Sequence, residues 1–485
     1  MQPPTTTWLS SKYVWHLRGG EVRLGPAAIA IKDGIVTQVL SDETIISAQK
    51  KTTYEKGGAW QDLGDLLITP SLVNAHTHLA MACFRGLTIE DATAGNVVED
   101  LFFAVEETMT PEDIAAFAKV GAYESLLAGV GLVWEHYYGG EALAEAITQT
   151  SLCAVLAPTL QDLDGPGKER WEEGLALTEA LDTPGWQARG IWSALGPHAT
   201  DTVSATLWEK IRTLANTRNL PIHSHAAQSI EEFERSITRH GKSPVAWLDS
   251  LGLFGEDGAP STLLVHAIFV SDHDLDLISG APAKVTLGFC PYSQLVFGFP
   301  ADVARWQAHS IPWYVATDAA ASNDSMNLQK ELRYIAGLRT MEASFHPDYR
   351  QFAKSGALAD AKTANAARQK IYRAREGFAQ DAFLLSHVFD IPGDLHPAFT
   401  AGTIAPGALA NLAVWDTTHP SMWPGLRPMR TLAMGDTTDA LWNVMSRGVW
   451  VGEGGNYHRS LTDSQAFIDA KNTASQRLQA LLKRL

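Results

Sequence analysis

The chain has 485 residues, a formal net charge of -16 at pH 7, and contents of 45% hydrophobic and 19% charged residues. It contains no Lys/Arg cluster, which argues against nucleic acid or an anionic membrane surface as a partner. The three cysteines, Cys83, Cys153 and Cys290, are widely spaced, so we expect neither a disulfide framework nor a thiolate zinc site. Because the N-terminus has no apolar leader and no apolar run reaches about 18 residues, we expect a cytoplasmic protein.

The predicted elements change character at about residue 67. Before it, short strand-like runs are separated by turn signals, as in "AAIAIKDGIVTQVL", where "KDG" favours a hairpin turn. From residue 67 on, eight short apolar runs, from "LITPSLVNAHTHL" to "PWYVATDAA", alternate with segments of helix length. This alternation predicts an α/β fold, with a parallel (β/α)8 barrel of the TIM type over residues 67–402.

Strand signals return after residue 403, in "TIAPGALANLAVWD" and "DALWNVMSRGVWVGEGG". They resemble the first 66 residues in style, and we therefore expect residues 1–66 and 403–457 to form one β-sandwich module built from both chain ends. The segment 341–400 is helical by composition and pattern, and residues 458–485 are predicted to form a C-terminal helix.

Potential metal ligands stand at or just after the C-terminal ends of the eight runs. In a (β/α)8 barrel, this end of the strands is the catalytic face. A single histidine there would more often have a structural role, but several converging on one rim favour a functional site. The residues are His76, His78, His136, His198, His223, His225, His266 and Asp318.

The spacing of these residues suits one divalent ion. His76 and His78 are one residue apart, and on a strand such side chains share a face. A third imidazole is available at His225 and a carboxylate at Asp318, a set that suits zinc, iron or a neighbouring divalent ion with a position left for water. Such an ion makes water a nucleophile near neutral pH, and His266 on the next run could polarise the group under attack.

The stretch "PSLVNAHTHLAMACFRGL" resembles the signature of the amidohydrolase superfamily. The closer similarity is to its mononuclear aminohydrolase branch, which includes methylthioadenosine/S-adenosylhomocysteine deaminases, guanine deaminases and triazine hydrolases. Five further stretches carry the resemblance across nearly the whole chain: "LGPHATDTVSATLWEKI", "LPIHSHAAQSIEEFERSITRHGKSPVAWLDSLGLF", "LLVHAIFVSDHDLDLI", "ATDAAASNDSMNLQKELR" and "AGTIAPGALANLAVWD".

The resemblance implies one divalent metal ion per chain, zinc or alternatively iron. The implied ligands are His76, His78, His225 and Asp318. No carboxylated lysine is expected, because no lysine ends one of the eight runs. The resemblance also implies that His266 contacts the activated water or the substrate. His223 shares a strand face with His225 and is expected to support the site.

Four residues are expected on the substrate side. His198 lies in "LGPHATD", which resembles the family's Gly-Pro-His segment. Glu99 matches approximately a glutamate that nucleoside-type members use on ribose hydroxyls, with a solvated place on a helix surface as an equal alternative. His136 could line the pocket or be purely structural. Gln294 lies in "CPYSQLVFGFP", where many relatives read Asn-Pro-Ser-Ser-Asn, and is expected in the pocket wall.

One residue departs from the branch where chemistry is expected. Three residues after the third histidine, relatives carry a glutamate that moves a proton from the activated water to the ring nitrogen, and this chain has Gln228. An amide forms hydrogen bonds but does not shuttle a proton at neutral pH. Gln228 could be natural and suit a leaving group that needs no help from that position, with Asp318 or His266 handling the proton. It could also be an engineered Glu→Gln change, or it could mark a protein that binds its ligand without turnover.

The sequence therefore predicts a metal-dependent aminohydrolase that acts on a C–N bond of a purine-, pterin- or triazine-like heterocycle. The alternatives are a hydrolase of an amide, carbamate, urea or aryl-halide bond in the same pocket, and a form with impaired catalysis. The expected partners are a small heterocyclic substrate and further copies of the chain in a homodimer or higher homo-oligomer, with no nucleic acid and no membrane.

Overall fold

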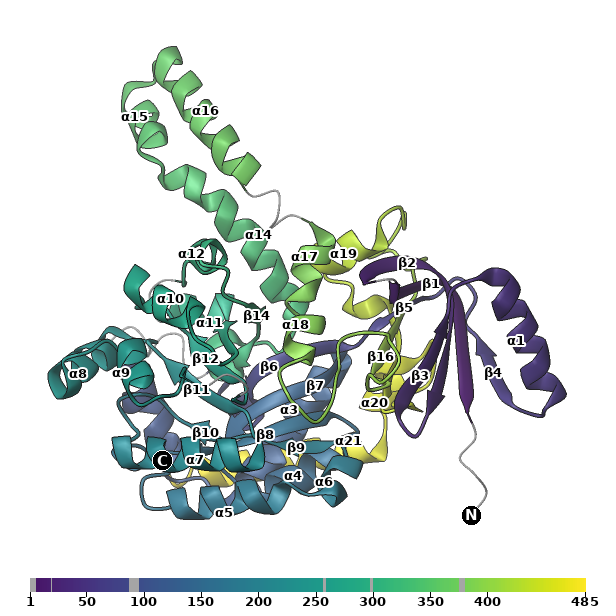
Figure 1. Ribbon diagram of the computed structural model, residues 1–485, viewed down its shortest axis with the longest axis horizontal. Helices are drawn as coiled ribbons and strands as arrows, with labels where there is room; N and C mark the ends of the chain where they lie inside the picture. The colour runs from purple at the N-terminus through teal and green to yellow at the C-terminus, as the bar shows by residue number, and fades with distance from the viewer. Residues whose placement is uncertain (1–5, 19, 87–95, 256–258, 297–299, 375–379) are drawn as a thin grey trace.

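The computed structural model describes residues 6–18, 20–86, 96–255, 259–296, 300–374 and 380–485 (Figure 1). Strands from both chain ends form a sheet at one side, and parallel strands surrounded by helices form the larger body beside it. A pair of helices projects from this body. None of the helices in the described ranges combines the length and the apolar character needed to cross a membrane.

The sheet at the side contains eight strands in the order β18-β17-β16-β5-β1-β2-β3, with β4 paired to β1. The strands are β1 (Thr7–Arg18), β2 (Glu21–Lys32), β3 (Ile35–Leu40), β4 (Ala59–Asp62), β5 (Leu67–Pro70), β16 (Leu412–Trp415), β17 (Leu441–Ser446) and β18 (Val449–Trp450). Strand β16 pairs antiparallel with both β5 and β17, so C-terminal strands extend a sheet begun by N-terminal ones. All eight strands belong to one sheet, and their pairing does not show the two stacked sheets of the predicted sandwich.

Each of the eight apolar runs contains at least one strand, and the strands pair in parallel. The strands are β6 (Leu72–His78), β7 (Val130–Tyr137), β8 (Cys153–Leu160), β9 (Ile191–Ser193), β10 (Gly196–Pro197), β11 (Ile222–Ala226), β12 (Thr262–His266), β13 (Val285–Phe289), β14 (Trp313–Val315) and β15 (Asp318–Ala319). One sheet has the order β10-β8-β7-β6-β15, with β9 on β8, and the other runs β11-β12-β13-β14. A single parallel bridge between Leu195 and Ile222 links the two sheets.

Helices cover these strands and connect them. In the first part of the body they are α2 (Ala104–Glu106), α3 (Pro111–Leu127), α4 (Gly140–Thr148), α5 (Trp171–Leu181), α6 (Pro184–Ala188), α7 (Ala205–Arg218), α8 (Ile230–His240), α9 (Pro244–Ser250), α10 (Asp272–Ser279), α11 (Pro291–Val296) and α12 (Val303–Ala308). Helix α3 begins where Thr110 caps it in a capping box with Asp113 and Pro111 fits the first turn.

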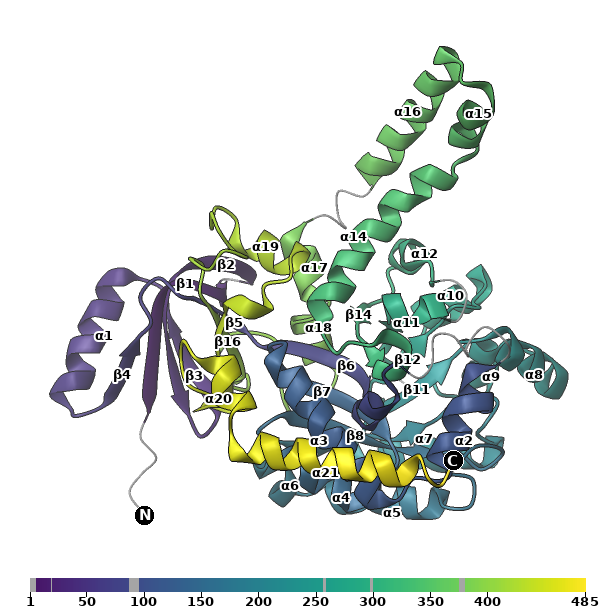
Figure 2. The ribbon, with the colours of Figure 1, turned by 180° about the vertical axis from the view of Figure 1, so that it is seen from behind.

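The remaining helices follow the last parallel strand, except α1 (Glu43–Glu55), which lies in the side sheet's segment. They are α13 (Ala320–Asn323), α14 (Leu328–Phe345), α15 (Pro347–Ser355), α16 (Leu358–Ala374), α17 (Asp381–Ser386), α18 (Asp390–Gly393), α19 (Pro428–Met434), α20 (Tyr457–Thr462) and α21 (Gln465–Leu481). Figure 2 shows α21 lying along α3, where Phe467 contacts Tyr123 with ring centroids 5.2 Å apart.

Two apolar clusters lie on opposite faces of the parallel strands. On β12, Leu264 packs into the larger cluster, which includes residues of the covering helices. Its neighbours Leu263 and Val265 belong to a second cluster built mainly from alternate residues of the parallel strands. Because side chains alternate along a strand, successive residues pack into different apolar clusters. The polar residues of the site lie at the ends of the strands.

Candidate metal centre and active site

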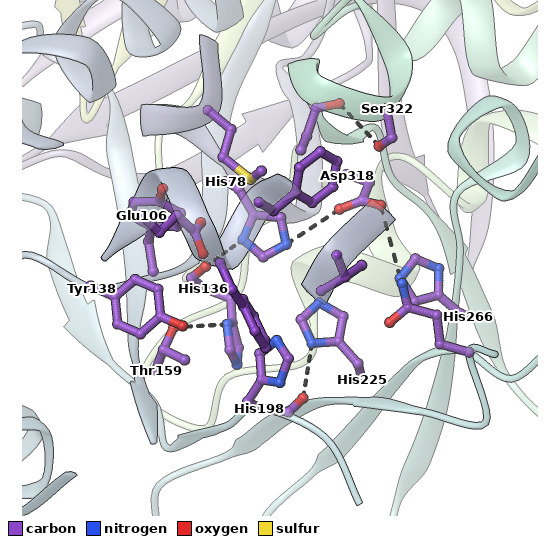
Figure 3. A pocket seen from close by; sticks show the side chains of 17 residues that line it. His78, Glu106, His136, Tyr138, Thr159, His198, His225, His266, Asp318 and Ser322 are labelled. Atoms are coloured by element: carbon purple, nitrogen blue, oxygen red, sulfur yellow. Dashed lines mark hydrogen bonds and ion pairs between the residues drawn. The ribbon is translucent and has the colours of Figure 1, made fainter. Parts of the chain in front are cut away.

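Histidine and aspartate side chains converge at the C-terminal ends of the parallel strands. His76 and His78 end β6, His225 comes from β11, His266 ends β12 and Asp318 begins β15. Two sets of three can place a ligand atom of each residue within 4.8 Å of the others: His76, His78 and His225, and His76, His266 and Asp318. Figure 3 shows His78, His225, His266 and Asp318 around one space.

The Asp318 carboxylate divides its two oxygens between different partners. Its Oδ1 atom lies 3.2 Å from Nε2 of His76 and 3.3 Å from Nε2 of His78. Its Oδ2 atom accepts a hydrogen bond from the Ser293 hydroxyl at 2.5 Å and lies 3.8 Å from Nε2 of His266. Although burial alone would raise it, hydrogen bonds to His76 and His78 hold the pKa of Asp318 well below its usual range.

The three histidines predicted as ligands have their other ring nitrogen occupied. Nδ1 of His78 lies 2.5 Å from the carbonyl oxygen of His136, and Nδ1 of His225 lies 2.8 Å from that of His198. A carbonyl oxygen only accepts, so each of these Nδ1 atoms donates a hydrogen, and Nε2 is the ring nitrogen that remains for the metal. Nδ1 of His76 similarly faces Nε2 of His223 at 2.9 Å. This arrangement is the one that histidine metal ligands need, so the residues fit a divalent ion.

Backbone strain is concentrated where these residues leave their strands. Asp318 has a φ of 60°, His266 a φ of 79° and Ala227 a φ of 52°, all in the left-handed region. Each such residue costs about 1–3 kcal/mol and persists only where its surroundings hold it. The backbone after His266 is held by a 3.0 Å hydrogen bond from Ala267 N to the carbonyl oxygen of Ala226. The fold thus keeps strained turns at the site, as functional sites often do.

Except for His78, the imidazoles that line the site are neutral at pH 7, because burial lowers their pKa. Burial lowers the pKa of His198 and of His266 to about 3 and holds the pKa of His225 well below its usual range. For His78, burial is the largest single influence and lowers the pKa, but the hydrogen bond to Asp318 and the charges of nearby carboxylates together raise it. Neutral rings can donate one hydrogen bond and accept another, which suits both metal ligation and substrate contact.

Two buried glutamates of this region were not found from the sequence. Glu135 accepts hydrogen bonds from the Thr77 hydroxyl at 2.7 Å and from Leu79 N at 2.9 Å, and so braces the end of β6. Burial raises its pKa to about 7 and has the same effect on Glu106. A charged residue in the otherwise apolar run "GVGLVWEHYY" was the signal for Glu135. Glu106 lies in an acidic segment, where nothing local distinguishes it.

A cavity of about 50 Å³ opens onto these groups. Its walls include His78, His136, His198, His225, His266 and Asp318. Gln228 also lines it, beside the aromatic rings of Phe102, Phe103 and Tyr138. A larger cavity of about 590 Å³ lies next to it and shares Glu106, Tyr137, Tyr138 and Thr159.

Two residues expected on the substrate side are engaged elsewhere. The carboxylate of Glu99 pairs with the guanidinium of Arg235, which also reaches Asp201 at 3.0 Å. Gln294 is buried, and its amide donates to the carbonyl oxygen of His266 at 3.2 Å and accepts from Ala301 N at 2.8 Å. Neither is among the residues that line the small cavity, whereas His136, His198 and Gln228 are. The substrate roles of all these residues stay predictions.

Comparison with known proteins places this geometry in a family. Residues 67–369 match the amidohydrolase family. The methylthioadenosine/S-adenosylhomocysteine deaminase of Haloarcula marismortui is 29% identical over 411 residues, covering 84% of this chain and 85% of the relative. The 5'-deoxyadenosine deaminase of Methanobrevibacter smithii is 30% identical over 269 residues, covering 55% of this chain and 60% of the relative.

Solved structures show the same fold. An adenosine deaminase from Xanthomonas campestris with bound zinc superposes with a TM-score of 0.76 at 22% identity, covering 99% of both chains. A guanine deaminase from C. acetobutylicum with bound guanine gives a TM-score of 0.71 at 16% identity, covering 92% of this chain and 100% of the other. With the family match spanning residues 67–369, the chain belongs to the amidohydrolase family.

Proposed function

We propose that the protein is a metal-dependent aminohydrolase that cleaves a C–N bond of a nitrogen heterocycle and releases ammonia or an amine. The observation that carries the proposal is the convergence of Nε2 atoms from His76 and His78 on Asp318 in a cavity lined by neutral His198 and His266. The sequence relatives named above are deaminases of adenine nucleosides, and this supports a purine-like substrate among the purine-, pterin- and triazine-like candidates.

We assign the metal to His76, His78, His225 and Asp318, with zinc as the first candidate and iron as the second. The engaged Nδ1 atoms of the three histidines support this assignment, because they leave Nε2 as the ligand atom. The zinc in the Xanthomonas campestris structure is consistent with it. When bound, a divalent ion supplies a Lewis acid that brings the pKa of water close to neutral.

The protein's own groups then orient the substrate. His266 faces the Asp318 Oδ2 atom and lines the cavity, so it can form a hydrogen bond to the activated water or to a polar atom next to the ring carbon under attack. His198 directs Nδ1 to Thr202 at 3.0 Å, which leaves its other ring nitrogen for the substrate. His136 directs Nδ1 to Thr159 at 3.2 Å and contributes its ring to the cavity wall. Asp318 or His266 handles the proton that a glutamate moves in relatives.

The architecture that we propose for this site is a closed (β/α)8 barrel. The bridge from Leu195 to Ile222 supports closure at one gap between the parallel sheets. At the other gap, β14 ends at Val315 and β15 begins at Asp318, so the chain itself leads from one sheet to the strand that pairs with β6. We divide the chain into this barrel at residues 67–402, a module at 1–66 and 403–457, and a C-terminal helical segment at 458–485.

Gln228 favours a second candidate reaction in the same cavity. It lines the cavity without supplying a carboxylate, so a leaving group that departs without protonation from this side suits it better. Hydrolysis of an aryl-halide bond meets this condition, because the halide leaves as an anion, and carbamate, urea and amide bonds are further alternatives in the same cavity. The role of Gln228 in either reaction is a proposal.

The test is a substrate panel of purines, pterins, pyrimidines and triazines given to enzyme loaded with zinc or with iron. Ammonia is measured by a coupled assay, and amine, chloride and alcohol products by chromatography. Ammonia release that disappears in His225→Ala is the expected result. Turnover of halide or carbamate substrates alone would select the second reaction, and no turnover with fully loaded enzyme would contradict both.

A further inference from the structure

Thr317 stands immediately before Asp318, and two asparagine side chains, from β6 and α13, hold it in place. Thr317 N donates to Oδ1 of Asn74 at 3.1 Å, and Thr317 Oγ1 accepts from Nδ2 of Asn74 at 2.7 Å. The carbonyl oxygen of Thr317 accepts from Nδ2 of Asn323 at 2.7 Å. All three residues are buried. Thr317 is therefore fixed at its backbone nitrogen, its backbone oxygen and its hydroxyl, an arrangement that we call the Thr317 clamp.

The Asn74 half of the clamp joins Asp318 to the strand that carries two predicted metal ligands. Asn74 lies on β6, the strand that ends in His76 and His78. Strand β15 pairs with β6 through Asp318 and the residue after it. Because the Asn74 amide both accepts from Thr317 and donates to it, neither strand can slide along the other without breaking two hydrogen bonds. The clamp thus fixes the register that places Asp318 Oδ1 at 3.2 and 3.3 Å from the Nε2 atoms of His76 and His78.

The Asn323 half of the clamp is supported by a buried carboxylate. Nδ2 of Asn323 donates to Oε1 of Glu331 at 2.9 Å as well as to Thr317, so both of its hydrogens are taken up. Oε2 of Glu331 accepts from Tyr292 N at 3.0 Å. Asn323 ends α13, Glu331 lies in the first turn of α14 and Tyr292 lies in α11, so this carboxylate holds the three helices together at one point. It leaves the Asn323 amide little freedom to turn away from Thr317.

The backbone of Asp318 needs this support. Its φ of 60° lies in the left-handed region, which a residue other than glycine keeps only where its surroundings hold it. The Thr317 carbonyl belongs to the peptide plane on the N-terminal side of that φ bond, and the clamp holds this carbonyl through Asn323. The direction in which the Asp318 side chain leaves the backbone therefore depends on the clamp. Ser293, which donates to Asp318 Oδ2 at 2.5 Å, then fixes the rotation of the carboxylate.

We propose that Asn74, Asn323 and Glu331 are positioning residues for Asp318, and that the Thr317 clamp sets the affinity of the site for its divalent ion. The inference rests on the proposed metal site and adds residues behind it. None of the three is among the described residues that line the small cavity, so they act through Thr317 and Asp318. Replacing the partners that orient metal ligands typically lowers metal affinity by about 10–100-fold, and loss of the clamp has this effect because Asp318 Oδ1 then moves relative to the Nε2 atoms of β6.

The test is the affinity of the full-length protein for Zn²⁺, measured by competition with a chromophoric chelator, with the visible spectrum of the Co²⁺-loaded protein as a second readout. Thr317→Val keeps the shape of the side chain but removes the hydroxyl that accepts from Asn74, so we expect the affinity to fall about 10-fold or more. Asn323→Asp removes the donor that reaches Thr317 and Glu331, and the same fall is expected. Both variants should change the Co²⁺ spectrum, because it reports the geometry of the ligands.

The matched control is Thr286→Val on β13. Thr286 is fully buried like Thr317, and its hydroxyl has no hydrogen-bond partner among the described residues, so the same chemical change leaves the clamp intact. Zinc affinity and the Co²⁺ spectrum should therefore stay those of the unaltered chain. Thr317→Ser provides a rescue: its hydroxyl can still accept from Asn74, and it should bind zinc within about threefold of the unaltered chain. A role in packing alone would instead be disturbed by the loss of the methyl group in Thr317→Ser.

Equal zinc affinity and an identical Co²⁺ spectrum in Thr317→Val and Thr286→Val would overturn the proposal. A loss of affinity in Thr317→Ser as large as that in Thr317→Val would also overturn it. An unaltered chain that binds no zinc would contradict both the clamp and the proposed metal site. Both measurements use the metal alone, so weaker zinc binding by Thr317→Val supports the clamp even if the loaded, unaltered protein turns over no heterocycle, a result that contradicts only the proposed reaction.

Discussion

Gln228→Glu is expected to raise kcat for deamination by about 100-fold or more, with KM changed much less. The substitution returns a carboxylate to a cavity whose neighbouring walls include His198, His225 and Asp318. With that carboxylate, a proton can be taken from the activated water and given to the ring nitrogen. The unaltered amide can only form hydrogen bonds at this place.

The surroundings of Gln228 indicate how large the increase in kcat should be. One general acid/base group is worth about 10²–10⁴-fold, or roughly 2.7–5.4 kcal/mol in the barrier. The backbone at this turn should stay in place, because Gln228 N donates to Glu232 Oε2 at 2.7 Å in a way that does not depend on the side chain. Glu232 opposes the gain, because burial raises its pKa to about 7 and a second nearby acid favours the protonated forms of both. We therefore expect the lower end of the range.

The assay is steady-state ammonia release on enzyme with a verified metal content, for every heterocycle that the unaltered protein binds. The control is Gln228→Asn, which changes the length of the side chain but adds no acid. Its kcat should not rise. Thermal unfolding of each variant separates effects on catalysis from effects on stability.

The reasoning fails if Gln228→Glu leaves every reaction unchanged, or if Gln228→Asn raises kcat as much. A third outcome would identify the natural reaction. If the carboxylate lowers turnover of the best substrate, Gln228 is adapted to that substrate, and the natural reaction is one whose leaving group needs no proton from this position.

Three further results are expected. His76→Ala and His225→Ala should each reduce the metal content from one divalent ion per chain, measured by elemental analysis, and two ions in the unaltered chain would contradict the assignment. Glu331→Gln should flatten the pH dependence of the unfolding free energy. Burial raises the pKa of Glu331 from 4.5 to about 7, so its contribution of about 3 kcal/mol to the unfolding free energy is present below pH 4.5 and lost as the pH rises through 7. Urea titrations at several pH values measure this, and an unfolding free energy that changes equally with pH in both proteins would refute it. Glu99→Gln should change KM by no more than about threefold and lower the unfolding free energy by up to about 1 kcal/mol, because the ion pair with Arg235 is lost. A KM increase seen only with nucleosides would instead show that Glu99 contacts the substrate.

The sequence was informative about the site where the signal is local. The one-residue spacing of His76 and His78 and their place at the end of an apolar run are properties of a few residues, and the structure brings both to Asp318. The hydrogen bonds that orient them depend on neighbouring strands. The His136 carbonyl that meets His78 lies on β7, and its position follows from the alignment of β6 with β7, which contains irregularities. No local pattern reveals such an alignment.

The same limit applies to the larger architecture. Similar strand texture at both chain ends predicted that they meet, and β16 does pair with β5. Their arrangement in one sheet rather than two depends on pairing between distant segments, which composition does not record. The helical composition of residues 341–400 likewise predicted helices but not that α15 and α16 project from the body.

The pairing of β5 with β16 also has a consequence for synthesis. Pro70 pairs with Leu412, which leaves the ribosome 342 residues later. At about 5–20 residues per second, the β16 edge of β5 waits roughly 17–70 s for its partner. Strand β1 can already pair with β2 during this time, but the other edge of β5 is open to any extended chain nearby. Expression at lower temperature, or with chaperones that bind extended segments, should therefore raise the yield of folded protein more than changes to the helices around the parallel strands.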